Sequence, residues 1–87
     1  MKKVFMYTLS TCPWCKKAKE FFEEKNIPYE YVDYDLEDKE SRKEILSDMK
    51  NSGGTTATPF VKIGDEVVVG YNPKKYAQLL GLEEEVE

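Results

Sequence analysis

The chain of 87 residues contains no histidine, one tryptophan and only two cysteines, and it has no long apolar run. A structural zinc site usually takes four nitrogen or sulfur ligands, so we expect no metal site here. No apolar stretch is long enough to span a bilayer, so we expect no membrane-spanning segment. The formal net charge is −4, which argues against general affinity for nucleic acid or anionic membranes.

The length predicts one domain over residues 1–87, with a single modest core. The N-terminal segment resembles a secretion signal only in Lys2 and Lys3, because the apolar run that follows is too short. We therefore expect a cytoplasmic protein. The sequence shows no internal repeat and no linker, and the acidic end, residues 83–87, is expected to be frayed.

Both cysteines stand in one motif, Cys12-Pro13-Trp14-Cys15, which follows an apolar run and opens a helical pattern. Pro13 suits the first helical position, where an N–H would be unpaired anyway, so Cys12 is the expected N-cap. A helix start presents free N–H groups and the positive end of the helix dipole, which favour a thiolate. The spacing lets Cys15 reach Cys12 within one turn. We therefore predict a reversible Cys12–Cys15 disulfide and a redox function, with half a zinc site or two inert thiols as the alternatives.

Hydrophobic periodicity predicts seven elements in the order β-α-β-α-β-β-α. A strand–helix–strand unit makes a parallel pair through a right-handed crossover, and the last two strands form a hairpin. The predicted fold is therefore α/β, a four-stranded mixed sheet with helices on both faces. The predicted strands cover residues 4–8, 29–35, 60–63 and 66–69. The predicted helices run from 13 to a stop at Asn26, over 38–50 with Gly53-Gly54 as the stop, and from 73 to a stop at Gly81. Residues 51–58 are predicted to form a polar loop.

With this order of elements, the chain resembles glutaredoxins, within the thioredoxin superfamily. Three motifs carry the resemblance: the CPWC motif after the first strand, Thr58-Pro59 before the third, and Gly70-Tyr71 before the last helix. It covers residues 2–82, nearly the whole chain. A C-x-x-C between a strand and a helix, with a Thr-Pro further along, is more specific than the cysteine pair alone. The resemblance implies a thioredoxin-like fold and a thiol–disulfide oxidoreductase that acts in electron transport and cell redox homeostasis.

The resemblance also implies the roles of the site residues. Cys12 would attack a disulfide, and Cys15 would resolve the resulting mixed disulfide. Pro13, Trp14 and Lys16 would support this site, with Trp14 as a partly exposed apolar contact and Lys16 as a source of positive potential. Pro59 would be the cis-proline that faces the active site, with an ordinary trans-proline as the alternative.

Substrate contacts are expected on the other side of the motif. Thr58 would offer its backbone N–H and C=O to an extended substrate. Gly70, Tyr71 and Asn72, at the start of the last helix, would hold a carboxylate of glutathione, with a plain turn and N-cap as the alternative. The expected partners are disulfide-containing proteins, together with glutathione or a thioredoxin-reductase-type flavoenzyme as reductant. We expect a monomer with no bound cofactor.

The chain departs from glutathione-using glutaredoxins at two places that would contact the tripeptide. Leu9 stands where these proteins usually carry lysine, and Gly70-Tyr71-Asn72-Pro73 replaces a Gly-Gly pair followed by acidic or small polar residues. The familiar Thr-Val-Pro is Ala57-Thr58-Pro59. In these changes the chain resembles glutaredoxin-like proteins that take electrons from a flavin reductase. Some of those proteins donate electrons to ribonucleotide reductase.

Two functions of other classes remain as alternatives. One is a carrier of an iron–sulfur cluster, bridged across a dimer by Cys12 and glutathione thiols. Pro13 and the second cysteine, Cys15, make it less favoured, because disulfide formation competes with ligation of the cluster. The other is a docking module whose thiols are incidental, which the acidic surface does not positively support.

Overall fold

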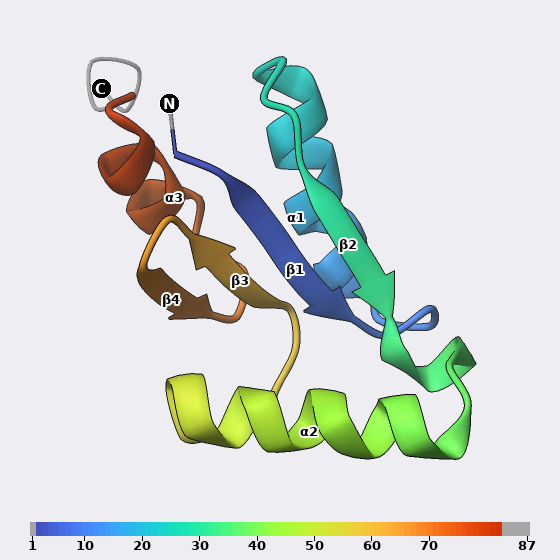
Figure 1. Ribbon diagram of the computed structural model, residues 1–87. Coiled ribbons are helices and arrows are strands. Elements are labelled where there is room, and N and C mark those ends of the chain that lie inside the picture. The colour runs from blue at the N-terminus through green and yellow to red at the C-terminus, as the bar shows by residue number, and fades with distance from the viewer. Residues whose placement is uncertain (1, 83–87) are drawn as a thin grey trace.

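The computed structural model describes residues 2–82 and confirms the predicted four-stranded mixed sheet. β1 pairs in parallel with β2 and antiparallel with β3, and β3 pairs antiparallel with β4. The strands therefore lie in the order β2-β1-β3-β4 (Figure 1). Their bounds are β1 Val4–Thr8, β2 Glu30–Asp33, β3 Phe60–Ile63 and β4 Glu66–Val69.

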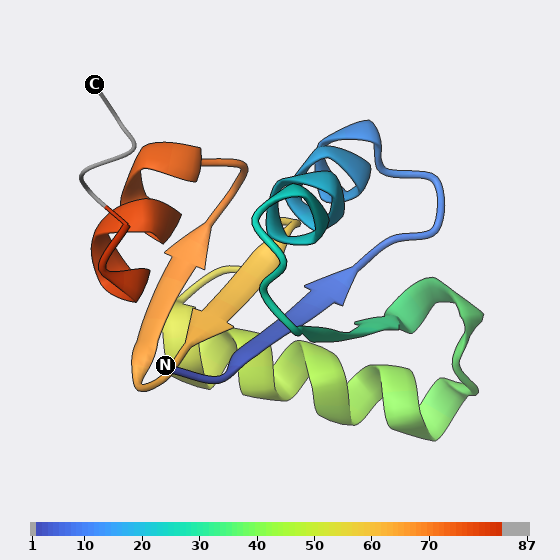
Figure 2. The same ribbon diagram turned by 90° about the horizontal axis from the view of Figure 1, so that it is seen from above.

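Three helices cover the two faces of the sheet, as predicted. Figure 2 shows α1 (Pro13–Glu24) and α3 (Pro73–Leu80) on one face and α2 (Lys39–Gly53) on the other. A short 3-10 helix, η1 (Tyr34–Leu36), joins β2 to α2. Within residues 2–82, no helix is long and apolar enough to cross a membrane.

Two predicted boundaries were wrong. The second strand ends at Asp33 rather than at residue 35, because the chain turns into η1 and the Asp35 carboxylate binds Ser10. Residues 51–53, predicted as loop, belong to the second helix, which ends at the predicted Gly53-Gly54 stop, where Gly54 has a left-handed backbone (φ 74°). The predicted fraying of residues 83–87 concerns residues outside those described.

The main core lies between the sheet and the pair α1 and α3. Alternate residues of β1 point to this face, as the period of two in a strand requires. The inner face of α1 repeats at i, i+3 and i+7, which holds Cys15 among apolar neighbours. Burying a large apolar side chain contributes about 1.5–3 kcal/mol, so this packing fixes α1 firmly on the sheet. Residues buried on this side include Val4, Met6, Cys15, Ala18, Phe22, Val61 and Tyr76.

On the opposite face, α2 is tied to the sheet by Asp48. This carboxylate accepts a hydrogen bond from the Tyr7 hydroxyl at 2.7 Å and pairs with Lys62 Nζ at 2.7 Å. Burial and the neighbouring Asp48 raise the pKa of Tyr7 to about 12. Near the end of α2, Gly53 lies so close to the Phe60 ring that a Cβ would stand 2.6 Å from it. The loop that follows α2 therefore returns to β3 from a fixed position.

Candidate active site

Cys12 caps α1 with its own sulfur, as the sequence predicts. Its backbone is extended (φ −91°, ψ 113°), and its Sγ accepts a hydrogen bond from the Cys15 N–H at 3.2 Å. Pro13 follows at the first position of the helix. A serine or aspartate oxygen usually fills this capping role. Here a sulfur fills it, so the helix start directs its donors at the thiol.

The surroundings of Cys12 favour its ionised form. Partial burial raises the pKa of Cys12, but it is outweighed by hydrogen bonds from the Cys15 thiol and N–H, the Thr58 hydroxyl and the Trp14 N–H. The net effect is a lowered pKa. The Thr58 Oγ1 lies 3.8 Å from Cys12 Sγ. Because the thiolate is the nucleophilic form, Cys12 has the chemistry of an attacking group.

Cys15 has the opposite character. Its side chain is 1% exposed, and burial, together with the interaction with Cys12, raises its pKa to about 11. Both cysteines are free thiols. The proton therefore favours Cys15, and the negative charge favours Cys12. Such an asymmetric pair can attack with one sulfur and hold the other in reserve.

A carboxylate from η1 holds the loop that precedes Cys12. Asp35 accepts hydrogen bonds from the Ser10 N–H at 2.8 Å and from the Ser10 hydroxyl at 2.6 Å. Two positions after Ser10, the Cys12 N–H donates to the Leu9 carbonyl at 3.1 Å. The sequence analysis missed this contact. The parallel register of β1 and β2 could have indicated it. Thr8 pairs with Asp33, so Ser10 and Asp35, each two positions further along, come to lie side by side.

The Thr58–Pro59 peptide bond is cis, which confirms the expectation from the resemblance. Pro59 is fully buried, and its carbonyl accepts a hydrogen bond from the Gly70 N–H at 2.8 Å. The Thr58 hydroxyl faces Cys12, a contact that the sequence analysis did not foresee because it considered only the Thr58 backbone. Residues from three distant parts of the chain thus meet at the cysteine pair.

Five of the predicted support and substrate residues line one groove of about 240 Å³: Trp14, Thr58, Pro59, Gly70 and Tyr71. The Trp14 side chain is 55% exposed, and its ring stacks on Tyr71 with centroids 5.8 Å apart and planes at 26°. Asn72 is not among the residues that line this groove. Its side-chain oxygen instead accepts from the Lys75 N–H at 3.2 Å and caps α3. We call this space the Trp14–Tyr71 groove.

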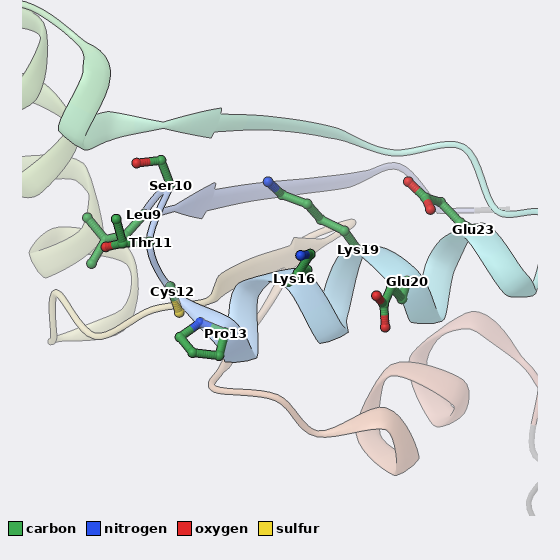
Figure 3. A pocket seen from close by; sticks show the side chains of 9 residues that line it. All are labelled: Leu9, Ser10, Thr11, Cys12, Pro13, Lys16, Lys19, Glu20 and Glu23. Atoms are coloured by element: carbon green, nitrogen blue, oxygen red, sulfur yellow. The ribbon is translucent and has the colours of Figure 1, made fainter.

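A larger groove of about 560 Å³ borders Cys12 on the side that faces β2 (Figure 3). At the end of this groove far from Cys12, two charged side chains have partners within the protein. Lys19 pairs with Asp33 at 3.5 Å, and Glu23 accepts from the Tyr29 hydroxyl at 2.6 Å. Lys16, the predicted source of positive potential, lies exposed at the end near Cys12. The full lining is Leu9, Ser10, Thr11, Cys12, Pro13, Lys16, Lys19, Glu20 and Glu23.

The side chains near the cysteines offer little to a metal ion. Cys12 and Cys15 are the two thiols of the chain. In the described part, residues 2–82, no group of three or more histidine, cysteine, aspartate or glutamate side chains is placed to hold a metal. The chemistry that this arrangement supports is exchange between thiols and disulfides.

Comparison with known proteins points to the same chemistry. Residues 4–68 match the family model of glutaredoxin. The chain is 37% identical over 76 residues to an uncharacterized glutaredoxin-like 8.6 kDa protein in the rubredoxin operon of Clostridium pasteurianum, which covers 86% of this chain and 93% of that protein.

Two solved structures are also similar to this chain. The glutaredoxin of Archaeoglobus fulgidus is 36% identical, with a TM-score of 0.85 over 92% of this chain and 87% of that one. The methanoredoxin of Methanosarcina acetivorans is 32% identical, with a TM-score of 0.84 over 91% of this chain and 84% of that one. The chain therefore belongs to the glutaredoxin family, and its activity is that of a thiol–disulfide oxidoreductase.

Proposed function

We propose that this protein reduces disulfides in proteins, or mixed disulfides with glutathione, through both Cys12 and Cys15. The observation that carries the proposal is the asymmetry of the pair. Hydrogen bonds hold the pKa of Cys12 low, whereas burial raises that of Cys15. The partly buried Cys12 is thus the nucleophile, and the fully buried Cys15 is the resolving thiol.

The reaction proceeds in two exchange steps. The Cys12 thiolate attacks one substrate sulfur, so that a new S–S bond forms, the substrate S–S bond breaks, and the departing thiolate takes a proton from solvent. Cys15 then releases its proton to solvent and attacks Cys12 Sγ. This step displaces the second substrate sulfur as a thiolate, which also takes a proton from solvent. The substrate gains two electrons and two protons, and the protein becomes the Cys12–Cys15 disulfide.

Substrate is proposed to lie extended along Thr58 and into the Trp14–Tyr71 groove. Pro59 presents no backbone N–H, so it does not compete as a donor beside the thiolate. Trp14 and Tyr71 offer an apolar surface. Gly70 and the start of α3 lie at the far end of the groove, where a carboxylate would suit the positive end of the helix.

The electron donor is proposed to be either glutathione or a flavoenzyme of the thioredoxin-reductase type, with no prosthetic group bound to the chain. Leu9 supports the flavoenzyme, because the family's lysine would provide a charged contact worth about 1.5–3 kcal/mol, or tenfold or more in affinity for glutathione. Ribonucleotide reductase is then one candidate acceptor. Turnover with glutathione and its reductase, compared with turnover with thioredoxin reductase, separates the two donors. We further propose that the protein acts as a cytoplasmic monomer.

Single-turnover reduction tests the proposal without any reductase. Pre-reduced protein is mixed with a peptide that contains one disulfide, and the products are counted after acid quenching. Wild type should yield one peptide dithiol per molecule, and Cys12→Ser should yield none. Ser47→Ala, on the exposed part of α2, serves as the control and should match wild type. Equal yields from wild type and Cys12→Ser would end the proposal.

A further inference from the structure

Four lysines lie near the starts of the two helices that meet at the Trp14–Tyr71 groove, in a chain whose net charge is −4. Two lie near the start of α1 and two in the first turn of α3, and neither helix has an acidic residue in its first turn. All four are exposed. We call this set the lysine rim: Lys16, Lys17, Lys74 and Lys75.

The rim forms because two helix starts converge. Trp14, in the first turn of α1, stacks on Tyr71, which lies just before α3. Tyr71 in turn contacts the ring of Tyr76 at 6.3 Å, and the Tyr76 hydroxyl donates to the Gly70 carbonyl at 2.7 Å. Tyr76 is fully buried, so the aromatic pair is anchored to the core. The positive ends of both helices therefore add to the charge of the lysines.

Among residues 2–82, no ion pair joins a lysine of the rim to an acid, whereas Lys19 and Lys62 have acidic partners. Two acids of α1, Glu20 and Glu23, line the larger groove, which Lys16 also borders at the end near Cys12. The Asp35 carboxylate accepts hydrogen bonds from Ser10. The starts of both helices thus carry four exposed lysines that form no ion pair within residues 2–82.

We propose that the lysine rim selects disulfides that lie in acidic polypeptide segments, an inference that rests on the proposed function. A segment extended through the groove would place the residues on one side of its cysteine near α1 and those on the other near α3. Charge complementarity of this kind raises the rate of encounter more than the final affinity. Encounter matters here, because the protein forms only a transient mixed disulfide with its substrate.

The range of the effect is set by screening. Exposed charges act over a Debye length of about 10 Å at 0.1 M salt, so only residues close to the reactive cysteine sense the rim. Steering by a charged surface around a cleft raises on-rates by about 10- to 1,000-fold and falls steeply with ionic strength. Selection of acidic segments is therefore expected at low salt and lost at high salt.

Three peptides test the inference. They share one intramolecular disulfide ring and differ only in flanks of three glutamates, three glutamines or three lysines. Single-turnover rate constants with pre-reduced full-length protein are measured in about 0.01 M and about 1 M salt, where the Debye length is about 30 Å and about 3 Å. At low salt the glutamate peptide should react at least about tenfold faster than the lysine peptide. At high salt the ratio should approach one.

Charge reversal on α3 supplies the matched comparison. The double variant Lys74→Glu, Lys75→Glu should lower the glutamate-to-lysine rate ratio several-fold. The double variant Lys39→Glu, Lys43→Glu makes the same charge change on α2 and should keep the wild-type ratio. Comparing ratios between variants removes any effect of the flanks on the reactivity of the peptide itself.

The outcomes separate the inference from the proposed function. If wild type reduces none of the peptides, the proposed function fails. If wild type reduces all three at one rate, or if reversal on α2 lowers the ratio as much as reversal on α3, the lysine rim does not select acidic segments. A fourth substrate, the glutamine peptide as a mixed disulfide with glutathione, gives a further outcome. If it reacts faster than all three ring peptides regardless of their flanks, the rim binds the glutathione carboxylates and does not select acidic segments.

Discussion

Asp35 holds Ser10 through both oxygens of its carboxylate, one bound to the Ser10 N–H at 2.8 Å and the other to its hydroxyl at 2.6 Å. The two residues lie two positions beyond the paired ends of β2 and β1. This contact attaches the loop before Cys12 to η1, the element that follows β2. Such a two-point hydrogen bond has directional as well as electrostatic character.

Removing either the Asp35 carboxylate or the Ser10 hydroxyl should destabilise the protein, because each change breaks the same contact. We expect Asp35→Ala and Ser10→Ala each to lower the melting temperature, and the double variant to lower it no further than the worse single variant. Thermal unfolding of the four proteins measures this. Additive losses would show that the two residues act independently. Ser10 holds the pKa of Asp35 below its ordinary value of 3.8, so the contribution is complete above that pH and is lost as the pH falls through the lowered pKa.

The Thr58 hydroxyl should measurably assist ionisation of Cys12. Thr58→Val removes the donor that lies 3.8 Å from the sulfur and keeps the shape of the side chain. Loss of about 0.5 kcal/mol from this long hydrogen bond should lower the thiolate fraction about twofold below the pKa. The pH profile of iodoacetamide alkylation should therefore move to higher pH. Thr56→Val is the control, and an equal displacement in both variants would contradict the assignment.

Cys15→Ser should trap substrate on Cys12. The first exchange step needs only the Cys12 thiolate, whereas release needs the buried second thiol. Incubation with a disulfide peptide should give a covalent adduct of one peptide per protein, detected by intact mass and reversed by dithiothreitol. Cys12→Ser should give no adduct. An adduct on Cys12→Ser would reverse the order of attack.

The stability of the reduced protein should rise with pH relative to Cys12→Ser. The pKa of Cys12 is lowered in the folded state from an ordinary value of 9.0. Between the lowered pKa and 9.0, the unfolded chain binds more protons than the folded protein, so stability increases with pH. The contribution is complete above 9.0 and is lost as the pH falls through the lowered pKa. Melting temperatures of both proteins under reducing conditions, from about pH 5 to about pH 9, should diverge, and parallel curves would refute the low pKa.

Gly53→Ala should destabilise the protein although alanine favours helices. A Cβ at this position would stand 2.6 Å from the buried Phe60 ring and 3.2 Å from Val67. Overpacking of this kind typically costs about 1–3 kcal/mol, against about 1 kcal/mol gained in helix propensity. Urea unfolding measures the difference. Asn51→Ala, exposed in the same helix, should not lower the midpoint, and a stabilised Gly53→Ala would show that Phe60 moves aside freely.

The resemblance to glutaredoxins predicted the cis peptide bond before Pro59, which the local preference of proline for a trans bond opposes. The bond before Pro59 is cis, although a trans bond is the usual form before proline. The resemblance also supplied the roles of Thr58 and Gly70, which now line one groove with Trp14 and Tyr71.

The sequence by itself determined the local structure at Cys12. Pro13 and the apolar spacing of α1 set the helix start, and the same spacing buried Cys15 one turn later, because helix capping and periodicity depend on residues within a few positions of one another. Only the tertiary structure decided the partners of this motif. Ser10 and Asp35 are 25 positions apart, and Cys12 and Thr58 are 46 apart. Their contacts depend on strand register and on how α2 returns the chain to the sheet, and no short-range preference encodes either.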